Sequence, residues 1–71
     1  MAERVEAEMV ANVWKVLVGV GDTVEAGQTL VILESMKMEI PVEAPAGGTV
    51  TEVAVTEGGV VQEGDLIATI G

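Results

Sequence analysis

The fold of this chain is decided by a stretch of sequence that occurs twice. Residues 5–34 read VEAEMVANVWKVLVGVGDTVEAGQTLVILE, and residues 42–71 read VEAPAGGTVTEVAVTEGGVVQEGDLIATIG. At an offset of 37 the two copies align without a gap, and nine of the 30 positions are identical. Such self-similarity indicates that one structural unit is built twice. The identical residues of the first copy are Val5, Glu6, Ala7, Val13, Val16, Val18, Gly21, Val24 and Gly27.

Each copy has the pattern of short strands separated by glycine turns. Valine is abundant, and its branched side chain suits the pleated surface of a sheet. Turns are expected at the matched glycines, Gly21 with Gly58 and Gly27 with Gly64, with a very short strand between the two turns of each copy. The longer expected strands, in chain order, lie at about 4–9, 12–18, 29–35, 41–45, 49–55 and 66–70.

Local irregularities are expected in two of these strands. The repeated valines Val13, Val16 and Val18 are spaced three and then two residues apart, which predicts a bulge or a sharp twist in a strand that should alternate. Pro41 and Pro45 lack an N–H group, so their strand should lie at an edge or where that group is not needed. A helix over residues 1–11 is the alternative for the N-terminus, but the match to a segment flanked by prolines favours a strand.

The repeat also predicts how the two copies are joined. One copy cannot bury its apolar face, whereas two copies related by a pseudo-twofold axis can face each other. We therefore expect one all-β domain over residues 1–71, a flattened barrel or sandwich of two antiparallel sheets (a barrel-sandwich hybrid). The strand at 29–35 must then continue into one at 38–44 through a two-residue hairpin loop, Met36-Lys37. Such loops prefer Asn-Gly, so symmetry rather than local propensity predicts this turn.

Composition excludes several classes of partner and site. Twelve acidic residues against three basic ones give a formal net charge of −9, which repels nucleic acid and anionic membranes and favours a basic protein partner. The chain has no cysteine and no histidine, and Glu34, Glu39 and Glu43 do not follow the spacing of a calcium loop, so no metal site is expected. No apolar run reaches about 18 residues and residues 1–4 do not begin a signal peptide, so a cytoplasmic protein is expected.

The predicted turn lies within Glu34-Ser35-Met36-Lys37-Met38-Glu39. Lys37 occupies the tip, so its amine should project into water. The flanking methionines have little to pack against at a tip, and methionine is common on surfaces that another protein binds. Partial burial of one methionine in the core is the alternative. Lys15 is the only other lysine, so a modifying enzyme would have few amines to choose from.

This segment resembles the Met-Lys-Met motif of biotin carboxyl carrier proteins, within the biotin/lipoyl attachment domain family. The resemblance covers nearly the whole chain, since it includes the repeat and the Gly-Asp turns at residues 21–22 and 64–65. In length the chain is similar to stand-alone, single-domain biotin attachment proteins. Some members carry a protruding thumb between the second and third strands; here residues 18–22 contain no insertion. There is also no Pro/Ala-rich linker, so the carrier is expected to reach its partners by diffusion or docking.

The resemblance implies that a biotin protein ligase attaches biotin to the side-chain nitrogen of Lys37. It further implies that biotin accepts carboxylate at a biotin carboxylase subunit and that carboxybiotin delivers it at a carboxyltransferase subunit. The carrier performs no chemistry itself, because the cofactor supplies the reactive group and the protein supplies its position. The residues that the ligase or carboxylase would recognise are Glu34, Ser35, Met36, Met38 and Glu39.

Other functions remain open from the sequence. A lipoyl carrier has the same fold and the same lysine position, although its tip typically resembles Asp-Lys-Ala, and Glu34 occurs in both groups. Modification by both biotin and lipoate, or an unmodified structural β-domain, are further alternatives. An enzyme is not expected: Ser35 and Lys37, two residues apart across a turn, need not face each other, and nothing forms an oxyanion site. The acceptor of the carboxyl group is not encoded in any motif, since acetyl-CoA, propionyl-CoA, pyruvate and urea carboxylases use similar carriers.

Overall fold

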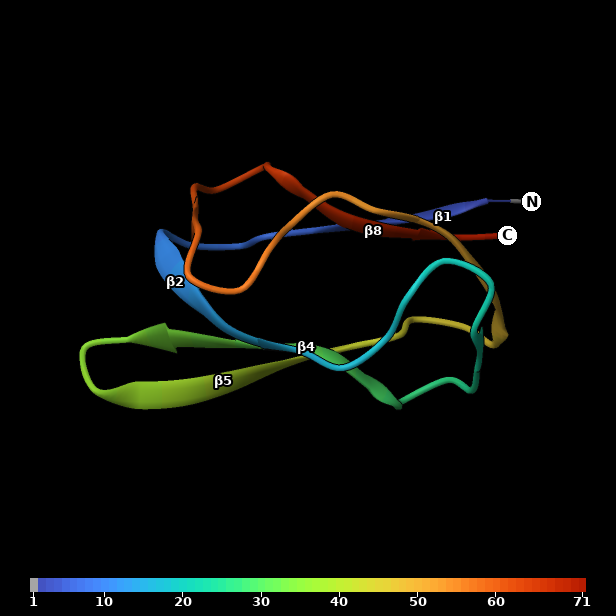
Figure 1. Ribbon diagram of the computed structural model, residues 1–71, viewed down its shortest axis with the longest axis horizontal. Helices are drawn as coiled ribbons and strands as arrows, with labels where there is room; N and C mark the ends of the chain where they lie inside the picture. The colour runs from blue at the N-terminus through green and yellow to red at the C-terminus, as the bar shows by residue number, and fades with distance from the viewer. Residues whose placement is uncertain (1) are drawn as a thin grey trace.

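The computed structural model describes residues 2–71 as eight strands in two four-stranded antiparallel sheets, with no helix in that range (Figure 1). One sheet has the order β1-β8-β6-β3 and the other β5-β4-β2-β7. The predicted all-β class is confirmed. The alternative of a helix at the N-terminus is wrong for residues 2–11, and Met1 lies outside the described residues. The strands are β1 (Glu3–Glu6), β2 (Ala11–Val16), β3 (Thr23–Val24), β4 (Thr29–Ser35), β5 (Met38–Glu43), β6 (Gly48–Val53), β7 (Val60–Val61) and β8 (Leu66–Ile70).

The two sheets are related by the internal repeat. Adding 37 to the residue numbers maps β1, β2, β3 and β4 onto β5, β6, β7 and β8. The same mapping relates the strand order of one sheet to that of the other. Hydrogen bonds follow the same symmetry: the Gly21 N–H donates to the Val50 carbonyl, and the Gly58 N–H to the Val13 carbonyl, both at 2.8 Å. Both glycines have positive φ, 97° and 89°. Each turn is therefore held by a strand of the other copy, which explains why one copy alone would not be stable.

A thin aliphatic core lies between the sheets. The bulge predicted from the valine spacing is present, because the register of β2 against β4 shifts between Val13 and Lys15. An equivalent shift in β6 lies between Val50 and Glu52. The extra residue lets both matched valines of each strand face inward. The buried residues are Val5, Ala7, Ala11, Val13, Val24, Leu30, Val31, Leu33, Ala44, Val50, Val61, Ile67, Ala68 and Ile70.

Several strand ends differ from those expected. The first strand stops at Glu6 rather than residue 9, because Ala7 leaves the ladder: its N–H donates to the Asp65 carbonyl and its carbonyl accepts from the Gly64 N–H, both at 2.8 Å. The second strand stops at Val16, after which the Leu17 N–H donates to the Leu30 carbonyl at 2.9 Å. The prediction holds for Pro41, since β5 is an edge strand, whereas Pro45 lies beyond the end of β5 at Glu43.

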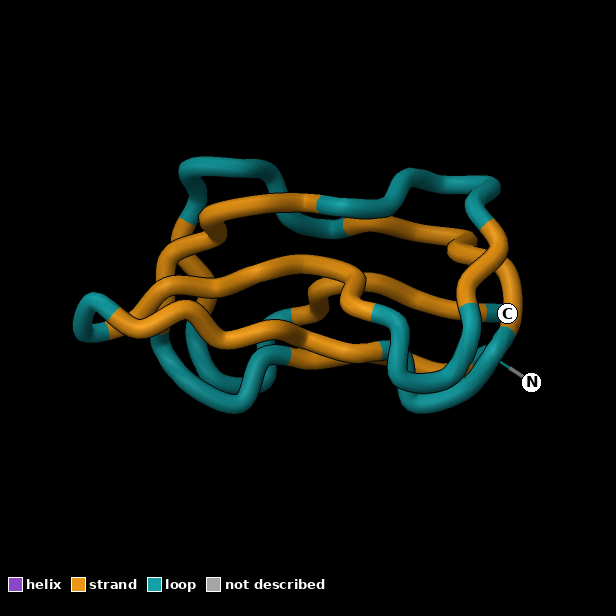
Figure 2. Tube along the Cα trace, turned by 90° about the horizontal axis from the view of Figure 1, so that it is seen from below, coloured by secondary structure: helices purple, strands orange, loops and turns teal. Residues whose placement is uncertain are grey.

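The molecule is elongated, with extents of 33 × 18 × 17 Å. The β4–β5 hairpin projects beyond the body at one end, and the two ends of the described chain lie side by side at the other (Figures 1 and 2). The pairing of Glu3 with Ile70 brings those ends together. In the described part of the chain, no helix is long and apolar enough to cross a membrane.

Candidate functional site

The projecting hairpin is closed by a strained two-residue turn. Ser35 pairs with Met38, which leaves only Met36 and Lys37 as the loop and confirms the predicted turn. Their φ angles are 53° and 64°, and positive φ at both central residues defines the type I′ turn that suits a twisted hairpin. Residues other than glycine rarely adopt this conformation, because the Cβ atom crowds the backbone. Strain of this kind is retained most often at functional sites.

Lys37 presents an amine that no other side chain among the described residues engages. Its side chain is exposed, and it forms no hydrogen bond or ion pair with any residue between 2 and 71. The other lysine differs, because the ammonium of Lys15 lies 5.5 Å from the ring centroid of Trp14 on β2. Both lysines are exposed, but only the amine of Lys37 lies at the end of the molecule, without an aromatic ring beside it.

The methionines on either side are among the most exposed apolar side chains. Met36 is 91% exposed and Met38 is 65% exposed, so the alternative in which one packs into the core is wrong. The tip of the hairpin therefore offers an apolar surface on both sides of the amine. Because methionine is flexible and polarisable, such a surface adapts readily to a partner protein.

Two carboxylates lie behind the tip. Glu34 and Glu39 are directly opposite each other on β4 and β5, and both are exposed. Like charges at paired positions destabilise a hairpin by roughly 0.2–1 kcal/mol, so this pair does not serve the stability of the fold. Ser35 is half-buried and lies on the opposite face of β4, together with Leu33. The structure thus brings all six predicted residues together at one end of the molecule, with the acidic pair on one face.

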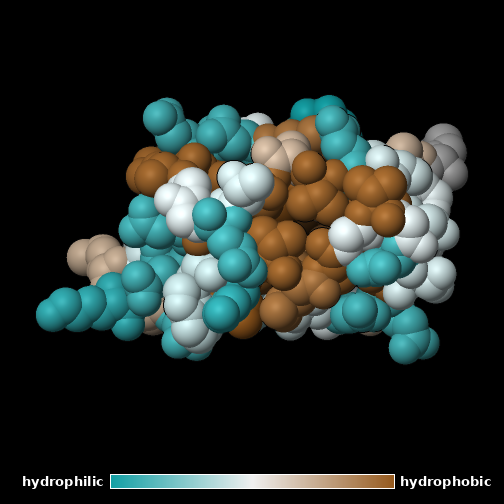
Figure 3. All heavy atoms as spheres, viewed as in Figure 1, coloured by the Kyte–Doolittle hydropathy of each residue, from teal (hydrophilic) through white to brown (hydrophobic). Residues whose placement is uncertain are grey.

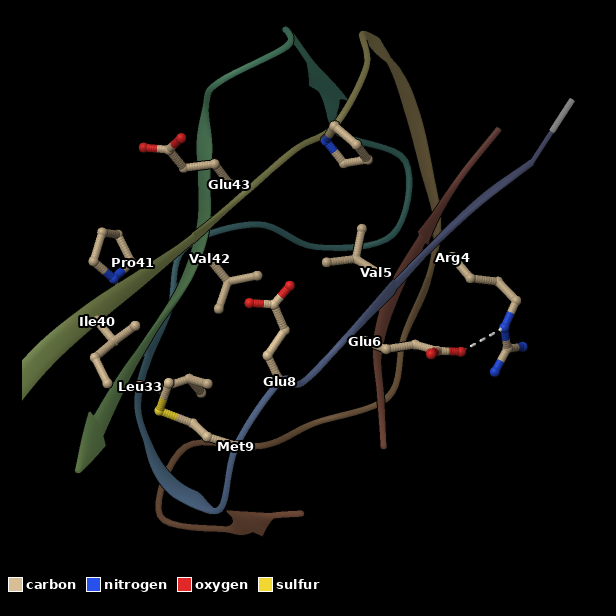
Figure 4. A pocket seen from close by; sticks show the side chains of 11 residues that line it. Arg4, Val5, Glu6, Glu8, Met9, Leu33, Ile40, Pro41, Val42 and Glu43 are labelled. Carbon is tan, nitrogen blue, oxygen red and sulfur yellow. Dashed lines mark hydrogen bonds and ion pairs between the residues drawn. The ribbon is translucent and has the colours of Figure 1, made fainter. Parts of the chain in front are cut away.

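One feature beside the hairpin was not predicted. A cavity of about 320 Å³ lies between the free edges of the two sheets, with β1 on one side and β5 on the other (Figure 4). We call it the β1–β5 groove. The sequence holds a partial signal for it, since the alternating residues Met38, Ile40 and Val42 form an apolar row along β5. The opening itself depends on the separation of the sheets, which no local pattern encodes.

Comparison with known families decides the identity of this fold. The biotin/lipoyl family model, described as biotin-requiring enzyme, matches residues 3–70. The chain belongs to this family. Membership confirms the resemblance drawn from the repeat and from the Met-Lys-Met segment.

Two similar members of the biotin/lipoyl family are themselves small proteins. The biotinylated protein TB7.3 homolog of Mycolicibacterium smegmatis is 61% identical over 70 residues, which cover 99% of both chains. The biotin/lipoyl attachment protein of Bacillus subtilis is 52% identical over 63 residues, covering 89% of this chain and 86% of that protein. The chain is therefore similar to these proteins over almost their whole length.

Solved structures place the same fold in larger proteins. The urea carboxylase of Kluyveromyces lactis matches with a TM-score of 0.92 and 39% identity, over 100% of this chain and 6% of the carboxylase. The lipoyl domain of the 2-oxoglutarate dehydrogenase complex of Azotobacter vinelandii matches with a TM-score of 0.77, over 94% of this chain and 95% of that domain. At 21% identity the second likeness concerns the fold alone.

Proposed function

We propose that the chain is a biotin carrier, and that Lys37 is the residue to which biotin is covalently attached. The observation that carries the proposal is the free amine of Lys37 at the tip of a strained hairpin, between two exposed methionines. A relative named as a biotinylated protein and a carboxylase containing a domain of this fold support biotin as the group carried. The extent of the domain over residues 1–71 and its cytoplasmic location stay predictions.

The arrangement fits a covalently attached acyl group. Attachment forms an amide between the lysine nitrogen and the carboxyl carbon of biotin, which a ligase must first activate with a leaving group. The exposed amine needs no rearrangement to enter the ligase, and a hairpin that is already ordered loses less entropy on binding than a flexible loop. When bound, the cofactor supplies the carboxyl-transfer chemistry, while this chain supplies its position.

The charge of the site indicates what its partners look like. The chain carries a formal charge of −9, and Glu34 and Glu39 place two carboxylates directly behind the tip. Basic surfaces on a biotin protein ligase, and on the biotin carboxylase and carboxyltransferase subunits, would be steered towards this end of the molecule. We propose that these partners recognise the residues around the lysine, namely Glu34, Ser35, Met36, Met38 and Glu39.

Lipoate attachment to the same lysine is the second candidate, because the fold is shared with a lipoyl domain and the Bacillus subtilis relative is named for both groups. Mass spectrometry of the protein isolated from its native host distinguishes the two. We expect the mass of one biotinyl group on the peptide containing Lys37. A lipoyl mass there would support the second candidate, and an unmodified lysine in a host with active ligases would support a structural β-domain instead.

A further inference from the structure

We propose that the outer face of the β5-β4-β2-β7 sheet is a surface on which a biotin protein ligase docks when it modifies Lys37. This inference rests on the proposed function, since it concerns the enzyme that would attach biotin. It goes beyond the residues around the lysine, because it adds a contact farther back on the body of the domain. We call this surface the Trp14 face; its members are Trp14, Lys15, Leu17, Ile32 and Pro41.

The pairing of three strands places these side chains together. Lys15 on β2 pairs with Ile32 on β4, and Ile32 pairs with Pro41 on β5, so the three form one row across the sheet. Val31 and Leu33, the neighbours of Ile32, are buried in the core. Because side chains alternate along a strand, the row lies on the outer side of the sheet. Figure 2 views the molecule from that side.

Trp14 and Leu17 flank this row on β2. Trp14 is the extra residue of the bulge in β2, and 5.5 Å separate the centroid of its ring from the ammonium nitrogen of Lys15. Leu17 lies two residues after Lys15 and is exposed, whereas its two neighbours in the chain pack against the core. A tryptophan that is 43% exposed and a leucine that is 52% exposed therefore lie beside the row.

The other half of the repeat shows what the fold requires at these positions. At the offset of 37, the counterparts of Trp14, Lys15, Leu17, Ile32 and Pro41 are Thr51, Glu52, Ala54, Thr69 and Arg4. The equivalent row is polar, because Glu52 pairs with Thr69 and Thr69 pairs with Arg4. That face also bonds to itself: the Thr51 hydroxyl donates to the Thr69 carbonyl at 3.3 Å, and the Thr69 hydroxyl to the Glu52 carboxylate at 3.4 Å. Since both halves form the same strands, the fold does not require the apolar side chains of the Trp14 face.

Apolar surface elsewhere on the molecule has a structural origin. Figure 3 shows such surface on the side where the chain turns after β2 and after β6. The half-buried valines that follow or end these strands, Val16 and Val18 with their counterparts Val53 and Val55, pack against the core. Both halves of the repeat carry them, as expected of residues that serve the fold. The Trp14 face differs, because one half alone carries it.

The Trp14 face continues towards the tip of the hairpin. Glu34 and Glu39 lie on the same side of the sheet, two residues nearer to the tip than Ile32 and Pro41. From Ile32 to the end of β4, three residues of extended strand span roughly 10 Å. A ligase must place an activated biotin against the Lys37 nitrogen, so the surface around its active site extends back over this part of the sheet. A carboxylase acts instead on the ring at the far end of the biotinyl arm, which keeps its active site farther from the sheet.

The chemistry of the face specifies the surface that covers it. Tryptophan is enriched among the residues that contribute most to binding at protein interfaces, where it fills an apolar pocket. The ammonium of Lys15 beside the ring positions Trp14 before binding, which lowers the entropy lost on association. The ligase is therefore expected to offer an apolar pocket to Trp14 and basic side chains to Glu34 and Glu39, nearer its active site.

A second molecule of the same chain is a poorer occupant. Each molecule carries a formal charge of −9 and only three basic residues, so two molecules would repel each other. A second molecule also has few cations to place opposite Glu34 and Glu39. A basic ligase surface meets both requirements.

Steady-state kinetics with the biotin protein ligase of the native host test the proposal. The apo substrates are the wild type, Trp14→Thr and Leu17→Ala, in which each new residue is the one that the other half of the repeat carries at that position. Trp14 lies away from the reacting nitrogen, so it stabilises the bound ground state and the transition state equally. Trp14→Thr should raise KM roughly tenfold and Leu17→Ala roughly threefold, with kcat unchanged. Val20→Ala is the matched control: Val20 is 68% exposed but lies in the turn after β2, so KM should not change.

Fluorine NMR supplies a second readout. Trp14 is the only tryptophan of the chain, so protein made with fluorinated tryptophan gives a single resonance from this position. Addition of unlabelled ligase should shift and broaden that resonance as the ring enters its pocket. A resonance that is unchanged at ligase concentrations well above KM would contradict the proposal.

The outcomes separate docking from the carrier function. Wild-type KM for both folded variants, or an equal rise in KM for Val20→Ala, would overturn the docking face and leave the carrier function intact. A fall in kcat without a rise in KM would also overturn it. Absence of biotin from the wild type would overturn the carrier function and the docking face together. Dimers of the apo wild type that are lost in Trp14→Thr would mean that a second molecule covers the face, which contradicts the proposal.

Discussion

Replacing Met36 by asparagine should stabilise the fold, because this residue is held at a φ of 53°. A left-handed conformation costs an ordinary L-residue roughly 1–2 kcal/mol, and asparagine tolerates it better, being several-fold enriched there. Met36 is 91% exposed, so the substitution loses almost no buried apolar surface. The expected gain is about 1 kcal/mol. For 71 residues the entropy of unfolding is about 0.15 kcal/mol/K, so Tm should rise by about 7 °C.

Thermal unfolding of apo Met36→Asn, followed by circular dichroism, measures this gain. Met38→Asn is the matched control, since Met38 begins the extended strand β5 and its φ is not positive. Asparagine is unfavourable in strands, so the control should be unchanged or slightly less stable. If Met36→Asn melted no higher than the wild type, or if both variants gained equally, the assignment of strain to the turn would be refuted.

The remaining predictions concern the core and the close approach of strands. Gly48→Ala should lower the free energy of unfolding by about 1–3 kcal/mol, because a Cβ there would lie 2.7 Å from the Gly71 carbonyl oxygen. Denaturant unfolding measures this loss. Gly19→Ala is the control: a Cβ at Gly19 meets nothing within 4 Å, so the denaturant midpoint should change little. Val53→Asp should leave most of the chain unfolded at 25 °C, because Val53 packs against a thin core and a carboxylate there has no partner. Val60→Asp is the control, since Val60 is 63% exposed, and it should melt at the temperature of the wild type. A similar loss of stability in both aspartate variants would argue against an inward Val53.

Much of this fold is predictable from its sequence because the sequence states it twice. The matched glycines Gly21 and Gly58 locate equivalent turns, and the spacing of Val13 and Val16 reveals the bulge that keeps both facing inward. The Met36-Lys37 turn follows from symmetry, although its residues disfavour the conformation they adopt. These features are predictable because each is fixed by backbone geometry or by which face of a strand is buried.

The features that were not predicted depend on how elements meet in three dimensions. The end of β1 is set by hydrogen bonds that Ala7 forms with Gly64, whose N–H donates to it, and with Asp65, whose carbonyl accepts from it; both residues are distant along the chain. The β1–β5 groove arises because two edge strands from different sheets lie opposite each other without pairing. The direct opposition of Glu34 and Glu39 requires the exact register of the hairpin, which is known only once the turn is fixed.

The central claim is that one amine, held outward at the midpoint of a duplicated β unit, receives the cofactor. Its most direct test is incubation of the apo protein with a biotin protein ligase, ATP and biotin, followed by intact-mass measurement of the wild type, Lys37→Arg and Lys15→Arg. We expect one added biotinyl group on the wild type and on Lys15→Arg, and none on Lys37→Arg, with all three proteins melting alike because both lysines are exposed. Biotin on Lys37→Arg, or a wild type left unmodified by an active ligase, would contradict the account.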